Sequence, residues 1–177
     1  MTRTIRIAGF GGQGVMLTGQ LLAKAATKQG LHCIWVPTYG PETRGGTANC
    51  AITISDEQIY SPVFNKSDDL IVFNGPSLDK FIDKVKEGGN LFYNSSIIKT
   101  EPKLEGRSVY AVPMNDIAIS LSQPKVANMA MMGAYLKMVD LFDDQVIIDV
   151  LTEFLGEKRG HLVSVNQEAI RLGGQAI

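Results

Sequence analysis

A glycine-rich turn near the start of the chain constrains the fold more than any other sequence feature. The segment Gly9-Phe10-Gly11-Gly12-Gln13-Gly14 fits the pattern Gly-x-Gly-x-x-Gly. It follows a strand-like segment at residues 4–9 and precedes residues 15–29, where apolar side chains recur at near-helical spacing and Gly30 ends the pattern. A strand, a glycine turn and a helix in this order are typical of the first β-α-β unit of an α/β domain.

The rest of the pattern favours the same class. Further strands are expected at residues 32–36 (stopped by Pro37), 47–55, 70–73, 90–94 and 108–112, and helices dominate after Pro113. Residues 58–60 are expected to form an antiparallel hairpin with the strand at 47–55. We therefore expect one α/β domain over residues 1–177, a three-layer sandwich. Its sheet is mixed and mostly parallel, with a Rossmann-like β-α-β start and a helical C-terminal third.

Two hydrophobic features have alternative interpretations. Residues 126–142 form a helix that is apolar nearly all round, so it must be buried either within this chain or against a partner subunit. Trp35 lies in a strand expected to be central, where a core position is favoured over a stacking role.

Composition excludes several classes of function. The formal net charge is −1, and the basic residues are scattered rather than gathered in the stripe that nucleic acid or an anionic membrane requires. No window approaches the roughly 18 apolar residues of a membrane helix, and the N-terminus lacks the pattern of a secretory signal, so a cytoplasmic location is expected. Cys33 and Cys50 lack metal-ligand spacing and are interpreted as small hydrophobic residues. No metal site is expected, and any electron carriers would belong to other chains.

The glycine turn can serve two purposes. Its glycines allow close backbone approach, and the helix that follows presents free N–H groups, which suit a phosphate or carboxylate from a cofactor or a partner chain. Alternatively, the glycines only permit tight packing of strand against helix. A dinucleotide site would need an acidic residue about 20 positions further on, at the end of the second strand. That strand ends Val36-Pro37-Thr38, so a nicotinamide or flavin dinucleotide is disfavoured.

A second loop, Thr38 to Gly46, follows the strand that should end beside the glycine turn. It contains Tyr39, Glu42, Arg44, Gly45 and Gly46. Arg44 could hold a phosphate or a partner's carboxylate through two hydrogen bonds, or pair with Glu42 in a solvated surface turn. No nucleophile and base stand at recognisable spacing, so no catalytic residue is assigned.

Taken together, the two loops are recognisable. Gly9 to Gly14 followed by Tyr39-Gly40-Pro41-Glu42-Thr43-Arg44-Gly45-Gly46 resembles the gamma subunit, or fused gamma domain, of 2-oxoacid:ferredoxin oxidoreductases. The segments 127–134 and 165–171 resemble the helical and C-terminal segments of the same family, so the similarity runs the whole length.

The resemblance implies an activity for the complex to which this chain would belong, and it implies the partner subunits. These enzymes oxidatively decarboxylate a 2-oxoacid with coenzyme A to an acyl-CoA and pass the electrons to a ferredoxin-type acceptor. In that family, thiamine diphosphate and 4Fe–4S clusters lie on alpha, beta and delta-type subunits, and the gamma unit carries neither. This chain is thus expected to be a noncatalytic subunit, inactive when isolated, that binds no cofactor alone and assembles with alpha, beta and in some complexes delta subunits. Among the 2-oxoacids, 2-oxoglutarate is favoured over pyruvate.

By the same resemblance, Gly9, Gly11, Gly12, Gln13, Gly14, Tyr39, Glu42, Arg44, Gly45 and Gly46 are expected to contact coenzyme A or a partner chain. Two other functions remain open. One is a free-standing dinucleotide-binding oxidoreductase, and the other is a ligand-free scaffold domain. A homodimer of the isolated chain is compatible with an exposed subunit interface.

Overall fold

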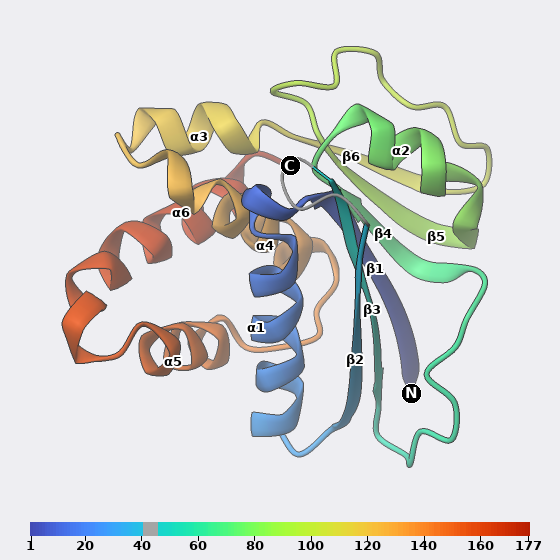
Figure 1. Ribbon diagram of the computed structural model, residues 1–177, viewed down its shortest axis with the longest axis horizontal. Coiled ribbons are helices and arrows are strands. Elements are labelled where there is room, and N and C mark those ends of the chain that lie inside the picture. Colours follow the sequence, from blue (N-terminus) through green and yellow to red (C-terminus); the bar gives the residue numbers. More distant parts are fainter. Residues whose placement is uncertain (41–45) are drawn as a thin grey trace.

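A six-stranded sheet divides the molecule into layers in the computed structural model, which describes residues 1–40 and 46–177 (Figure 1). The strand order is β2-β3-β1-β4-β5-β6. The strands are β1 Thr2–Phe10, β2 His32–Tyr39, β3 Thr47–Ser55, β4 Ser67–Val72, β5 Val85–Asn94 and β6 Ser108–Val112.

The sheet is mixed and mostly parallel, as the sequence predicts. β1, β4, β5 and β6 pair in parallel, whereas β3 runs antiparallel to both of its neighbours, β1 and β2. The apolar residues Leu70 to Val72 are fully buried in β4, in agreement with a strand covered on both faces.

The source of the antiparallel part differs from the prediction. Residues 58–60 form no strand, so the expected hairpin across residues 56–57 is wrong. Instead β3 turns back along β2 and inserts between β2 and β1. Most of β3 is buried, which fits a strand with a neighbour on each side.

The edge position of β2 explains two further differences. The strand runs through Pro37 to Tyr39 rather than stopping at the proline, because an edge strand needs no ladder hydrogen bond from every N–H group. Trp35 therefore lies at the edge of the sheet rather than in its centre, partly buried and packed against the core beneath α1.

Helices cover both faces of the sheet, which gives the predicted three-layer sandwich (Figure 1). One face is covered by α1 and by the helical C-terminal third, and the other by α2 and the segment after β5. The helices are α1 Val15–Lys28, α2 Gly75–Phe81, α3 Met114–Ser120, α4 Ala127–Met138, α5 Asp144–Leu155 and α6 Val163–Gln175. Short 3-10 turns occupy Gly11–Gln13, Ile82–Lys84, Pro124–Val126 and Glu157–Leu162. None of the helices in the described ranges is long and apolar enough to cross a membrane.

The apolar helix predicted at 126–142 corresponds to α4, which ends at Met138 rather than at residue 142, and this chain itself buries it. α4 packs against α6, where Gly133 and Gly173 let the two backbones approach closely. An added Cβ at Gly133 would overlap the carbonyl oxygen of Ile170, and one at Gly173 would overlap that of Ala130. Of the two interpretations left open by the sequence, burial within the chain therefore accounts for this helix.

Candidate site at the carboxyl edge of the sheet

The glycine turn connects β1 directly to α1. β1 ends at Phe10, residues Gly11–Gln13 form a 3-10 turn, and Gly14 adopts φ 84° before α1 begins at Val15. This φ lies in the left-handed region, which glycine adopts without strain. The turn therefore leaves the first N–H groups of α1 at the carboxyl edge of the sheet, where parallel α/β folds bind ligands.

The side chain of Gln13 holds the turn in place. Its Oε1 accepts hydrogen bonds from the backbone N of Phe10 at 2.8 Å and from Nδ2 of Asn74 at 2.9 Å. Its Nε2 donates to the carbonyl of Phe73 at 3.3 Å. The polar atoms of Gln13 are thus engaged within the chain, and their direct effect is to fix the turn against the end of β4.

The four glycines of the turn have two different environments. A Cβ at Gly9 would lie 2.9 Å from atoms of Gln13, Val15 and Phe73, and one at Gly14 would lie 2.6 Å from Nδ2 of Asn128. Gly11 and Gly12 are exposed and have nothing within 4 Å of an added Cβ. Tight packing explains Gly9 and Gly14, whereas Gly11 and Gly12 leave backbone open to an approaching group.

Asparagine side chains continue the site along the neighbouring strand ends. Asn74 Oδ1 accepts from Ser77 N at 2.9 Å and caps α2. The buried Asn94 donates through Nδ2 to the carbonyl of Phe73 at 3.1 Å and to Oδ1 of Asn115 at 2.7 Å. Sequence reasoning missed these three asparagines, although Asn74 and Asn94 stand at the ends of strands recognisable from their apolar runs.

A pocket of about 370 Å³ lies beside the turn. Its polar wall combines Gly12 and Gln13 with the amides of Asn115 and Asn128 and with the exposed Lys125. Asn128 is buried and donates to Oγ1 of Thr18 at 3.4 Å. Open backbone at a helix start, side-chain amides and one lysine are groups that favour an anion.

The second loop starts from the same edge of the sheet. Strand register places Tyr39 opposite Ala48, and Ala48 opposite Gly9. The Tyr39 side chain is 68% exposed, and Gly40 N donates to the carbonyl of Thr47 at 2.9 Å. Gly46 is partly buried just before β3. Glu42, Arg44 and Gly45 lie outside the described residues, so their predicted contacts stay predictions.

The cysteines behave as packing residues. Cys50 is buried and Cys33 partly buried, and burial raises the pKa of each thiol to about 11. Such thiols stay protonated near neutral pH and are poor nucleophiles and metal ligands. Among the described residues no three His, Cys, Asp or Glu side chains gather as a metal site would require.

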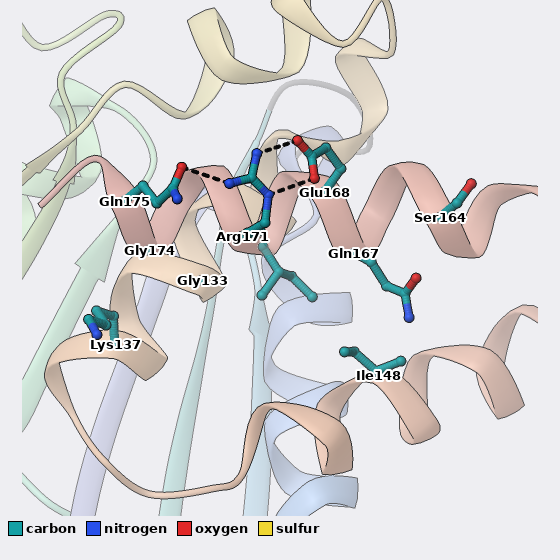
Figure 2. A pocket seen from close by; sticks show the side chains of 10 residues that line it. Gly133, Lys137, Ile148, Ser164, Gln167, Glu168, Arg171, Gly174 and Gln175 are labelled. Carbon is teal, nitrogen blue, oxygen red and sulfur yellow. Dashed lines mark hydrogen bonds and ion pairs between the residues drawn. The ribbon is translucent and has the colours of Figure 1, made fainter.

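A second cavity, of about 510 Å³, lies between α4, α5 and α6 (Figure 2). Arg171 on its α6 side donates to Glu168 Oε2 at 2.8 Å and to Gln175 Oε1 at 2.8 Å. Gly133, where α4 and α6 approach closely, forms part of one wall. Because Arg171 has its partners Glu168 and Gln175 on the same helix, we interpret this cavity as a groove left by helix packing.

The predicted resemblance can be compared with known proteins. Residues 4–176 match the family described as pyruvate ferredoxin/flavodoxin oxidoreductase. The chain belongs to this family. The match includes both loops and the C-terminal helix. Relatives that are single subunits, among them a solved gamma subunit, confirm the resemblance to gamma-type subunits.

Relatives in this family differ in length. The ketoisovalerate oxidoreductase subunit VorA of Methanothermobacter marburgensis is 36% identical over 170 residues, which make up 96% of this chain and 35% of VorA. The 2-oxoglutarate synthase subunit KorC of Methanocaldococcus jannaschii is 33% identical over 165 residues, 89% of this chain and 88% of KorC. The chain therefore spans about a third of VorA and most of KorC.

Solved structures show the same unit. The 2-oxoglutarate:ferredoxin oxidoreductase from Magnetococcus marinus, with 2-oxoglutarate, coenzyme A and succinyl-CoA bound, superposes with a TM-score of 0.91 at 28% identity. That match covers 99% of this chain and 31% of the Magnetococcus chain. The keto/oxoacid ferredoxin oxidoreductase gamma subunit from Geobacter sulfurreducens gives a TM-score of 0.83 at 26% identity, covering 98% of this chain and 97% of the subunit.

Proposed function

We propose that this chain is the noncatalytic gamma unit of a complex that oxidatively decarboxylates a 2-oxoacid with coenzyme A to an acyl-CoA. The observation that carries the proposal is the superposition of nearly the whole chain on about a third of one chain of an enzyme that contains coenzyme A and succinyl-CoA. In this proposal thiamine diphosphate and 4Fe–4S clusters belong to alpha, beta and delta-type partners, which pass electrons to a ferredoxin-type acceptor. The isolated chain is then inactive.

The carboxyl edge of the sheet is the part of this chain that we assign to coenzyme A or to the partner chain beside it. Coenzyme A carries phosphate groups, and the open backbone at Gly11 and Gly12 together with Lys125 provides donors for an anion. The exposed Tyr39 lies at the same edge and offers an aromatic surface. Arg44 in the loop that follows would add a second cation.

A bulky residue at Gly12 tests this assignment. Gly12→Leu has open space around its Cβ, so the chain should fold, while the new side chain blocks approach to the turn. In the purified, anaerobic complex we expect the KM for coenzyme A to rise by about tenfold, which corresponds to about 1.4 kcal/mol of lost binding. Gly160→Leu is the matched control, because Gly160 also has open space but lies in the 3-10 turn before α6. Equal KM values for both variants would remove the turn from coenzyme A binding.

The complex itself is tested by purification of the tagged chain without oxygen. Co-purifying chains with a thiamine diphosphate motif and ferredoxin-like cysteine runs would support the gamma role, and a chain that purifies alone would contradict it. Assays of that complex with 2-oxoglutarate, pyruvate and 3-methyl-2-oxobutanoate then identify the substrate. We favour 2-oxoglutarate over pyruvate.

The dinucleotide alternative is disfavoured by the topology as well as by the missing acid. In a dinucleotide-binding unit the second strand lies next to the first and presents its acidic residue to the ribose. Here β3 separates β2 from β1. Micromolar binding of NAD(P) or FAD by the isolated chain would restore that alternative.

A further inference from the structure

Arg6 is a partly buried cation whose charge is not balanced within the described part of the chain. Its guanidinium lies 5.2 Å from the ring centroid of Phe64 and 5.1 Å from that of Phe81. Its Nη1 donates to Oδ1 of Asn49 at 3.2 Å, whereas its Nε is buried without a hydrogen-bond partner. Burial lowers the pKa of Arg6, and no carboxylate among the described side chains, which leave out residues 41–45 and 144, forms an ion pair with it.

The contrast with Arg3 shows what is missing. Arg3 lies on the same strand and donates to both oxygens of the buried Asp69, at 2.5 and 2.8 Å. A cation that loses its water normally gains such a partner, because an unpaired charge in a partly desolvated position costs free energy. Two aromatic rings and the Asn49 amide surround Arg6, but no described carboxylate balances its charge.

The sheet around Arg6 is open towards the β2 edge. Strand register aligns Val36, Ala51, Arg6 and Leu70 in one row across β2, β3, β1 and β4. Exposure is 38% at Val36, intermediate at Ala51 and Arg6, and 0% at Leu70, where α2 and its neighbours form the second core. On this face α2 thus covers the row at Leu70 in β4, whereas Val36 in β2 stays exposed to solvent.

The segment between β3 and β4 adds apolar side chains to the same face. Phe64 from this segment packs over Arg6, and Tyr60 and Val63 from it line a hollow with Thr4 and Thr53. Tyr60 is 89% exposed and Val63 80% exposed. Exposed tyrosine and aliphatic side chains around a desolvated arginine have the composition of the central part of a protein–protein interface.

We propose that another chain of the oxidoreductase complex docks on this face and places an aspartate or glutamate carboxylate against Arg6. The face consists of Val36, Ala51, Arg6, Tyr60, Val63 and Phe64, and we call it the Arg6 face. The inference rests on the proposed function, because it names the surface through which the gamma unit joins its partner. It is separate from the glycine turn, since Arg6 lies in the middle of β1 and the turn follows its end.

Charge and surface shape together favour a polypeptide over a small ligand. The hollow beside Tyr60 measures about 260 Å³, and its polar lining consists of neutral hydroxyl and amide groups. Among the six residues that define the Arg6 face, Arg6 is the charged one. Because Nε is buried, a carboxylate on a protruding side chain would accept hydrogen bonds from the Nη groups of Arg6.

The test uses Arg6→Met, which keeps an aliphatic side chain between the two phenylalanine rings and removes the cation. In the isolated chain we expect the unfolding midpoint to stay unchanged or rise, because an unpaired charge is lost. In the complex we expect the dissociation constant of the chain from its partner subunits to increase at least about tenfold, because the partner's carboxylate is left unpaired. Tyr60→Ala should also weaken assembly.

Two matched controls keep the test specific. Lys158→Met removes an exposed cation from the 3-10 turn before α6, and Ile119→Ala removes an apolar side chain that is 63% exposed on α3. Neither should change the dissociation constant more than about twofold. The measurement is the concentration dependence of complex formation between the tagged chain and its partner subunits, recorded without oxygen.

The other outcomes contradict either the inference or the proposed function, and they can be told apart. Unchanged affinity for both Arg6→Met and Tyr60→Ala removes the Arg6 face from the interface while the proposed function stands. Failure of the wild-type chain to bind any partner contradicts the proposed function instead. If inorganic phosphate raises the melting temperature of the wild-type chain but not of Arg6→Met, Arg6 serves a small anion. If the isolated chain forms a dimer that Arg6→Met disrupts, the occupant is a second copy.

Discussion

At the scale of single residues, Gly14 and Gly11 belong to the same motif but should tolerate substitution very differently. Gly14→Ala places a Cβ 2.6 Å from Asn128 Nδ2 in a backbone with φ 84°, whereas Gly11→Ala meets open space. We expect Gly14→Ala to lower the free energy of unfolding by about 1–3 kcal/mol and Gly11→Ala to change it by less than about 0.5 kcal/mol. Urea denaturation of both variants measures the difference, and equal losses would mean that the turn is packed differently.

The same motif shows how far single residues could be understood from sequence. The pattern correctly predicted a tight turn that joins a strand to a helix. It could not separate Gly9 and Gly14, which have neighbours within 3 Å of an added Cβ, from the open Gly11 and Gly12. Those neighbours include Phe73 and Asn128, which are distant in sequence and reach the turn only through the folded sheet and α4.

At the scale of secondary-structure elements, the α4–α6 crossing depends on its glycines. Gly133→Ala and Gly173→Ala each drive a Cβ into a backbone carbonyl of the facing helix, so the helices must separate. We expect each variant to lose at least about 2–3 kcal/mol of unfolding free energy, at the upper end of overpacking effects.

Gly174→Ala provides the control for this crossing. Its nearest neighbour, the carbonyl oxygen of Gly133, would lie 3.4 Å from the new Cβ, which is ordinary contact. Thermal and urea unfolding should therefore place Gly174→Ala near the wild type and the two other variants well below it. A small loss at Gly133 or Gly173 would show that the helices yield more easily than their contact implies.

Elements were predicted well where local pattern decides them and poorly where pairing decides them. The alternation of apolar strands and helices located all six strands and the C-terminal helices. The hairpin at residues 58–60 was wrong because β1 and β2 occupy the two sides of β3. Pro37 did not end its strand because β2 lies at the edge of the sheet. Pairing partners are set by the whole sheet and leave no signal in the local sequence.

At the scale of the whole molecule, Asp68 links β4 to β1 and β5. Its Oδ2 accepts from Thr4 N and Thr4 Oγ1, each at 2.7 Å, and its Oδ1 accepts from Lys86 at 2.9 Å. Burial alone would raise the pKa of Asp68, but the hydrogen bonds from Lys86 and Thr4 outweigh it and lower the pKa. The stabilising effect is therefore present above the unfolded pKa of about 3.9 and is lost as pH falls through the lower folded pKa.

We accordingly expect Asp68→Asn to make unfolding less dependent on pH in acid. The variant should be less stable than the wild type near neutral pH, and the difference should shrink as pH falls below about 4. Urea denaturation at a series of pH values measures this. A difference that stays constant down to pH ~2 would mean that Asp68 acts through its shape rather than its charge.

The sequence alone determined the class of fold, the glycine turn and the family, because these follow from local periodicity, backbone freedom at glycine and two loops that occur together. The tertiary structure decided which strand lies beside which, and with it the insertion of β3 between β1 and β2. It also decided that α4 is buried by its own chain and that Arg6 has no carboxylate among the described residues. These features depend on contacts between residues far apart in the chain, which form only when the sheet and helices pack together.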